Sequence, residues 1–387
     1  MSTDNSVYPV LKKMLLVCRL FLYAPYQLDG ERNLRKSPIQ DYVQHTILMT
    51  FHTIVLVGRI AEIITFSISN PYKILSRIRI FYVELYALQV FCKTKMEYES
   101  IRKVFDRVKV IDDAVRLTAE QEGSFSRQLR KRILQIFIYF ILCLVYIYRN
   151  TFGMPIWALA IWSSIVTLFV LQPFVCDVLL WLLLVICEQY YGFVYQQLES
   201  MQKTIRPHKA VHISNLRTLY GKTHTVLHDI NAVYADRLLT GILFNFFETV
   251  YYTFAIIIML KNWREISITK LYSYIIFMLL YIMCLFNRMW IILTVQSRLC
   301  KQRKCISKAV HKLMKEPADR KTTTELSIFS LELLHRKNNI TANGFFTVDN
   351  TIIKSLLSGA MSIILILIQV KFPGYENGIR PIEDLMQ

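Results

Sequence analysis

Long apolar segments alternate with polar connections along most of the chain. A helix needs about 20 apolar residues to cross the hydrocarbon core of a bilayer. Seven segments meet this requirement, namely residues 46–66, 74–92, 133–152, 156–186, 238–260, 271–295 and 351–370. The fourth exceeds the thickness of the bilayer, so we expect it to continue beyond the membrane as a helix. The pattern predicts an all-α, seven-transmembrane fold.

The basic residues lie mainly on one side of these spans. Of 46 lysines and arginines, 34 lie in the N-terminal segment and in the connections after the second, fourth and sixth spans, whereas 6 lie in the other connections and the C-terminal tail. Cytoplasmic connections are enriched in lysine and arginine. The imbalance predicts an intracellular N-terminus and an extracellular C-terminus. This topology is opposite to that of a G-protein-coupled receptor.

Composition narrows the function classes. Hydrophobic residues make up 54% of the chain, against about 45–50% in ordinary soluble domains. The net charge of +18 follows from the basic connections between apolar spans, so we expect membrane lipid and no nucleic acid as a partner. No phosphate-binding glycine loop, HExxH or GxSxG motif occurs, and we predict no enzyme activity.

The histidines and the first apolar run suggest no further site. The pairs His208/His212 and His224/His228 have a spacing that can bind zinc, but no cysteine or carboxylate converges on them, so we predict no metal and no cofactor. Residues 14–24 carry Arg19 in their middle and lack a cleavage pattern. We expect them to form a helix on the inner membrane surface.

The organisation predicted from these features is one compact domain. Residues 98–114 and 212–233 alternate apolar and charged positions at helical spacing, which is typical of helices that extend the spans into the cytoplasm. The expected parts are a cytoplasmic N-terminal segment (1–45), six transmembrane helices with an outer ligand pocket and cytoplasmic extensions (46–297), a cytoplasmic anchor region (298–350), a seventh, pore-lining helix (351–371) and an extracellular tail (372–387).

The last span carries a polar stripe. At 100° of rotation per residue, the serines, the glycine and the glutamine of residues 355–369 fall in one sector about 100° wide. The members of this sector are Ser355, Ser358, Gly359, Ser362, Ile366 and Gln369. Two readings remain open: a pore wall, narrowed near Ile366, Gln369 and Val370, or a packing seam of small residues against another helix. Since one helix cannot enclose a pore, the first reading requires an oligomer, most simply of four chains.

A second group of candidates lies in the outer halves of the other spans. Aromatic side chains there suit an amphipathic pocket for a small organic ligand, although an interfacial aromatic belt accounts for at least half of them. The two carboxylates Glu84 and Glu248 either line that pocket or form a buried hydrogen-bonded network. The predicted pocket residues are Tyr82, Glu84, Tyr146, Trp157, Trp162, Glu248, Tyr251, Tyr274 and Phe277.

The C-terminal sequence resembles the signature of insect gustatory receptors. That family carries Thr-Tyr, five hydrophobic residues and Gln-Phe in its last helix. The corresponding residues here are Ser362-Ile363, five hydrophobic residues and Gln369-Val370, preceded by Gly344-Phe345-Phe346 and Val348-Asp349. Isoleucine for tyrosine and valine for phenylalanine are the departures from the signature.

The resemblance implies a tastant-gated, non-selective cation channel in the plasma membrane of sensory neurons. Four chains, identical or mixed with other gustatory receptors, would surround the pore with their last helices, and Gln369 and Val370 would form the constriction. The expected ligand is a small tastant of the bitter or another non-sugar class. An obligate co-receptor, a seven-helix receptor that signals through G proteins, and a transporter are the alternatives.

Overall fold

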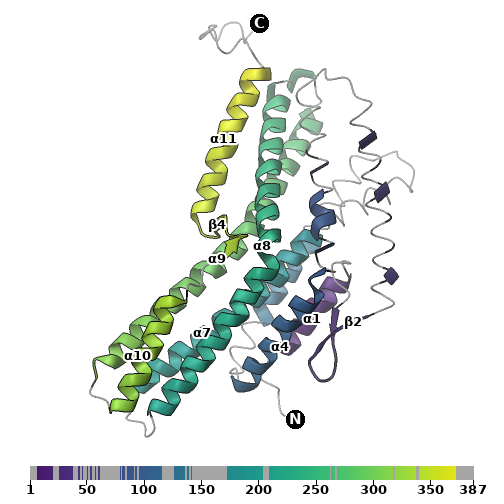
Figure 1. Ribbon diagram of the computed structural model, residues 1–387. Coiled ribbons are helices and arrows are strands. Elements are labelled where there is room, and N and C mark those ends of the chain that lie inside the picture. The colour runs from purple at the N-terminus through teal and green to yellow at the C-terminus, as the bar shows by residue number, and fades with distance from the viewer. Residues whose placement is uncertain are drawn as a thin grey trace. The chain divides into compact units, whose positions relative to one another are not determined.

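The structure, a computed structural model, describes most of the chain after residue 96. Its described residues are 7–20, 26–37, scattered positions between 42 and 96, 97–115, 126–135, 137, 138, 141, 172–203, 209–261, 263–265, 268–316, 319–336 and 340–371. Helices dominate these ranges (Figure 1). They are α1 (Tyr8–Leu20), α4 (Tyr98–Ala114), α7 (Gln172–Lys203), α8 (Lys209–Lys261), α9 (Ile268–Met314), α10 (Arg320–His335) and α11 (Thr351–Lys371), together with the short 3-10 helix η2 (Trp263–Glu265).

Four described helices contain segments that are long and apolar enough to cross a membrane. These segments are Pro173–Gln202, Lys209–Lys261, Tyr274–Met314 and Thr351–Gln369. They overlap the fourth to seventh predicted spans, whereas residues 46–66 and 133–152 lie largely, and residues 74–92 in part, outside the described ranges. α8 has 53 residues and is therefore about 80 Å long at 1.5 Å per residue. Since the hydrocarbon core is about 30 Å thick, α8 must continue well beyond it.

The chain divides into two compact units. The larger unit comprises Met1–Thr50, Ala87–Leu239 and Trp290–Asp349, and the smaller comprises Phe51–Tyr86, Thr240–Met289 and Asn350–Gln387. The prediction of one compact domain is therefore wrong, because the chain forms two compact units. The division between them falls inside α8 and α9. The predicted part boundaries, which describe roles rather than packing, stay predictions.

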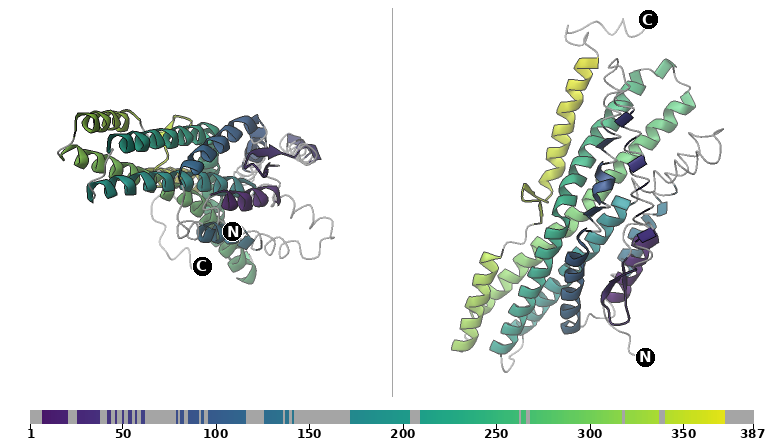
Figure 2. Two further views of the ribbon diagram at one scale, coloured as in Figure 1. Left: turned by 90° about the horizontal axis from the view of Figure 1, so that it is seen from below. Right: turned by 45° about the vertical axis from the view of Figure 1, so that its right-hand side comes forward.

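The core of the larger unit joins α7, α8 and α10. Tyr220 of α8 lies 5.2 Å from the Tyr191 ring of α7 and 5.6 Å from the Phe329 ring of α10, measured between ring centroids, and all three side chains are buried. α10 also runs beside the end of α9 (Figures 1 and 2), where Arg303 donates to the carbonyl of Leu333 at 2.7 Å. The helix expected over 98–114 is confirmed as α4.

The N-terminal helix packs into this unit. α1 contacts α7, and its apolar face, including Leu11, Met14 and Cys18, is fully buried. The buried face of the described part of the first apolar run packs on protein, and the expectation that this helix lies at the inner membrane surface stays a prediction. Next to α1, β1 (Tyr26–Leu28) pairs antiparallel with β2 (Leu34–Lys36).

A second hairpin precedes the last helix. β3 (Thr341–Ala342) pairs antiparallel with β4 (Phe346–Thr347), and the loop between them turns through Asn343 and Gly344, whose φ angles are 51° and 77°. Asparagine and glycine tolerate this left-handed conformation, which explains their place in the turn. Asn231 of α8 accepts from the Thr341 backbone N–H at 2.9 Å and donates to its hydroxyl at 3.3 Å. These bonds fix the hairpin to α8.

In the smaller unit, α11 packs on the second half of α8. Val250 of α8 forms a buried apolar cluster with Ala360 and Ile364 of α11, and Phe246 and Ile257 pack against it. Figures 1 and 2 show the two helices running side by side. This packing determines which face of α11 is left for function.

Candidate functional site: the last helix and the outer aromatic cluster

The predicted polar stripe of α11 lies on the side of the helix that is not packed against α8. The buried residues Ala360 and Ile364 occupy the opposite sector of the helical wheel, whereas buried Ile352 lies at the edge of the stripe, near Gly359. Of the stripe, Ser355, Ser358, Ser362, Ile366 and Gln369 are exposed and Gly359 is partly buried. The side chain of Val370 lies outside the described residues. Within the described chain, the serines therefore do not form an intramolecular packing seam.

Two serine hydroxyls bond to the helix that carries them. Ser355 donates to the carbonyl of Thr351 at 3.2 Å, and Ser362 donates to that of Ser358 at 3.1 Å. Such i to i−4 bonds satisfy the hydroxyl proton inside the membrane. The exposed hydroxyl oxygens can still accept hydrogen bonds, which suits a surface wetted by water and cations.

Gly359 marks the edge between the stripe and the packed face. A Cβ atom at this position would lie 3.2 Å from Cε2 of Phe246, closer than ordinary carbon–carbon contact. The absence of a side chain at Gly359 therefore lets α11 approach α8. Position 359 serves packing, whereas the exposed serines beside it do not.

Glu248 forms a buried ion pair with Arg79. The guanidinium of Arg79 donates to the two carboxylate oxygens at 2.6 and 3.0 Å, and it donates to the Tyr252 hydroxyl at 2.8 Å. The Glu248 side chain is 1% exposed and that of Arg79 is 21% exposed. Because a buried carboxylate needs a charge partner, this geometry favours the network reading of Glu248.

Aromatic rings enclose the same guanidinium. The Arg79 guanidinium carbon lies 4.5 Å from the ring centroid of Tyr251 and 4.8 Å from that of Tyr252, within cation–π range. The cluster continues into α9, where Tyr281 lies 4.8 Å from Tyr252 and 6.3 Å from Phe277. Two helices thus supply an amphipathic aromatic group around one cation.

These features agree with comparisons to known proteins. The profile of the 7tm chemosensory receptor family matches residues 97–372, more than half of the chain. The chain belongs to this family. Two structures of the insect olfactory receptor OR5 from Machilis hrabei resemble this chemosensory receptor, each over 94% of this chain and 100% of OR5. The structure in complex with eugenol has a TM-score of 0.71 at 12% identity, and the other has 0.70 at 15%. No curated protein matches the chain by sequence.

Family membership confirms that the chain is a multi-pass, helical, seven-transmembrane receptor. It also confirms the chemoreceptor family to which the C-terminal signature pointed. The family is one of receptors and not a class of enzymes. The similar structures are of olfactory receptors, so the distinction between taste and smell is taken up as a proposal below.

The structure brings part of the predicted ligand pocket together. Glu248, Tyr251 and Phe277 belong to the cluster around Arg79 and Tyr281. Tyr82 packs on Phe247 and donates to the carbonyl of Thr240 at 3.3 Å, whereas Tyr274 is partly buried on α9. The remaining four predicted residues, Glu84, Tyr146, Trp157 and Trp162, lie outside the described residues. The pocket as a whole stays a prediction.

Sequence reasoning missed Arg79, Tyr252 and Tyr281 as partners of Glu248. A buried carboxylate requires a cation, but the second, third and sixth spans contain four arginines, and the sequence does not distinguish between them. Arg288 has a different environment: it is buried, donates to the Tyr86 hydroxyl at 3.3 Å and lies over the Phe244 ring. Only the three-dimensional pairing separates these roles.

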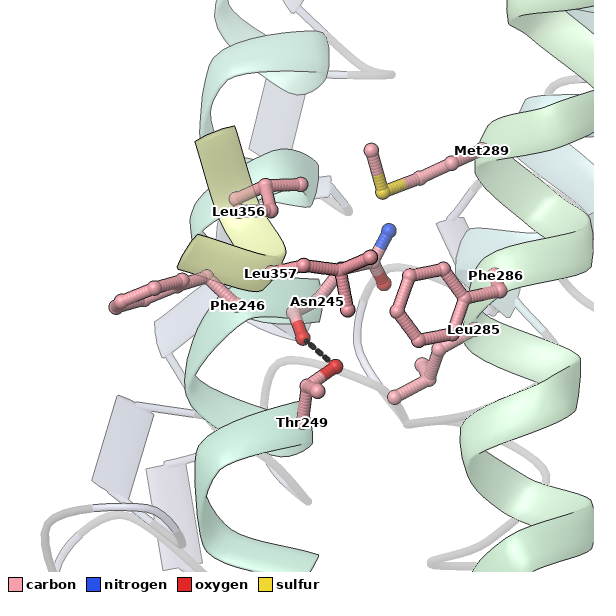
Figure 3. Close-up of a pocket in the computed structure, with 8 residues that line it drawn as sticks. All are labelled: Asn245, Phe246, Thr249, Leu285, Phe286, Met289, Leu356 and Leu357. Carbon is pink, nitrogen blue, oxygen red and sulfur yellow. Dashed lines mark hydrogen bonds between the residues drawn. The ribbon is translucent and has the colours of Figure 1, made fainter. Parts of the chain in front are cut away.

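A small void lies behind α11. It is lined by Asn245, Phe246 and Thr249 of α8, Leu285, Phe286 and Met289 of α9, and Leu356 and Leu357 of α11 (Figure 3). Its volume of about 10 Å³ holds at most one water molecule, so it cannot accept a tastant. Figure 3 shows the Asn245 amide directed into the space between the helices, and its oxygen has no hydrogen-bond partner among the described residues. α11 therefore packs with a gap against its neighbours.

Proposed function

We propose that the chain is a subunit of a ligand-gated, non-selective cation channel of the gustatory type. Four such subunits, identical or mixed, would surround a pore lined by α11. The observation that carries this proposal is the separation of the two sides of α11: apolar residues such as Ala360 and Ile364 pack on α8, while the serines and Gln369 face outward. Channels line their pores with rings of polar side chains and hydrophobic constrictions.

The ligand would be a small organic tastant, of the bitter or another non-sugar class. An aromatic cluster with one enclosed cation binds flat, polarisable molecules by ring contact and hydrogen bonding. The complex of OR5 with eugenol, an aromatic compound, supports this ligand class. A ligand that binds better when α11 has moved from its place on α8 would shift the population toward the open state.

Cysteine accessibility on α11 tests the pore assignment. In cells that express the receptor, a charged, water-soluble thiol reagent is applied during the current evoked by an agonist from a tastant panel. Ser362→Cys should be blocked progressively, because position 362 faces the lumen. Met361→Cys is the matched control: residue 361 is 56% exposed but lies about 100° around the helix from residue 362. The unaltered receptor controls for its eight native cysteines.

Equal modification of the two variants would refute a lumen that follows the stripe. A second variant, Gln369→Arg, should reduce cation current by electrostatic repulsion in the constriction, and an unchanged current and selectivity would remove Gln369 from the conduction path. A chain that is silent alone but conducts with a second gustatory receptor would instead have the co-receptor role.

A further inference from the structure

An asparagine of the smaller unit is buried beneath the last helix. Asn245 of α8 is 6% exposed, and its amide points into the small void between α8, α9 and α11 (Figure 3). The amide oxygen is buried and accepts no hydrogen bond from any residue that the structure describes. Because buried polar groups are nearly always paired, this oxygen requires an explanation.

The surroundings of the amide offer it little compensation. Among the described lining residues, the one other polar side chain is Thr249, which already donates its hydroxyl proton to the Asn245 carbonyl at 2.7 Å. A water in the void of about 10 Å³ would meet these two polar side chains, whereas a buried water typically makes about three hydrogen bonds. The other lining residues are apolar, namely Phe246, Leu285, Phe286, Met289, Leu356 and Leu357.

The last helix keeps the amide away from water. Leu356 and Leu357 of α11 line the void (Figure 3), and the neighbouring Ser355 and Ser358 are exposed on the polar stripe. Movement of α11 away from α8 would connect the void with the water that wets this stripe. The amide would then gain full hydrogen bonding. Leaving a buried polar group unpaired shifts an equilibrium by about five- to a hundredfold.

We propose that Asn245 is a positioning residue of the gate. Its amide is poorly satisfied beneath α11 and becomes hydrated when α11 moves, so it shifts the receptor toward the open state. This inference rests on the proposed channel function. Asn245 acts through α11 and not by contact with ligand or ions. An apolar side chain at position 245, or a hydrogen-bond partner for its amide on α11, removes this shift and favours the closed state.

Exchanging the residues at positions 245 and 356 tests the proposal. Asparagine and leucine have similar shapes, so Asn245→Leu removes the unpaired amide and Leu356→Asn offers it a partner, each with little change in volume. Each single variant should raise the agonist concentration for half-maximal current at least about fivefold. The double variant Asn245→Leu/Leu356→Asn again holds one amide without a partner. Its agonist sensitivity should therefore return to within about twofold of the parent receptor.

Melting of the detergent-solubilised receptor gives a second measurement that needs no current. Both single variants should melt at a higher temperature than the parent, and the double variant should melt below both. Unchanged agonist sensitivity in the single variants, or a double variant no more sensitive than either, would overturn the proposal, because packing would then explain the effects. A receptor that shows the expected melting pattern but never conducts would overturn the proposed channel function, and the gating role with it, while the unpaired amide would stand.

Discussion

The buried pair of Arg79 and Glu248 offers the sharpest test of how the smaller unit is held together. Glu248→Ala removes both carboxylate contacts, at 2.6 and 3.0 Å, and leaves a largely buried guanidinium without its counter-ion. Breaking a buried pair in this way costs about 3–5 kcal/mol. The rings at 4.5 and 4.8 Å recover about 1 kcal/mol by cation–π attraction. We therefore expect a loss of about 2–4 kcal/mol.

A loss of this size is a large part of the stability of an ordinary domain, about 5–15 kcal/mol. It should appear as a lower melting temperature of the detergent-solubilised receptor, measured by fluorescence-detected size-exclusion chromatography after heating. Surface biotinylation should show less receptor at the plasma membrane. The matched control is Glu99→Ala, whose pair with Arg102 at 3.8 Å is exposed. Exposed pairs contribute about 0–1 kcal/mol, so this control should barely move the melting temperature.

The double variant Arg79→Met/Glu248→Leu separates the pair from its isolated charge. Replacing both partners of a buried pair by apolar residues of similar volume is often neutral or stabilising. The double variant should therefore be more stable than Glu248→Ala, although it carries two substitutions and Glu248→Ala carries one. If the double variant melts lower than the single one, the reasoning from an unpaired buried charge is refuted, and the loss must come from packing.

Three further predictions concern other parts of the molecule. Gly359→Leu should displace α11, because a Cβ atom at this position lies 3.2 Å from the Phe246 ring, and this displacement should alter the agonist-evoked current. Adding Phe246→Ala to the same chain should restore the current. Asp319→Ala should lower the melting temperature, because the Asp319 side chain caps α10 by accepting from the N–H of Thr322. Hydrogen bonds from Thr322 lower the pKa of Asp319, so the cap stabilises fully above the ordinary aspartate pKa, and this contribution is lost as pH falls through the lowered pKa. A pH series of melting curves on the variant and the parent checks this prediction. An N-terminal epitope tag should be inaccessible to antibody on unpermeabilised cells and a C-terminal tag accessible, and the reverse would refute the charge-based orientation.

The sequence predicts the helices of this protein better than their contacts. Apolar length locates the segments of α7, α8, α9 and α11 that are able to span a membrane, because that signal is local and requires no partner. The alternation of polar and apolar residues likewise predicts α4. The division inside α8 and α9 has no local signal, since one continuous helix can belong to two compact units.

Pairings between distant residues are what the sequence does not give. Arg79 and Glu248 are 169 positions apart, and no periodicity relates them. The hairpin before α11 is different, because Asn343-Gly344 is a recognised turn signal. Gly344 of this turn also belongs to the residues that carry the family resemblance. A cavity lined by Lys131, Arg132 and Arg298 is likewise a product of the tertiary fold, because Arg298 is distant in sequence from the other two.

The contrast between α7 and α11 connects the packing with the proposed function. In the apolar window of α7, 83% of residues are buried, whereas 17% are buried in that of α11. Leu357, Met361 and Leu365 form an exposed apolar row on α11, so lipid or another subunit must cover that flank. A helix held by few buried residues and backed by a small void has a low free-energy barrier to local movement. The same sparse packing that leaves the serine stripe exposed therefore makes α11 the helix of the smaller unit best able to change position when a ligand binds.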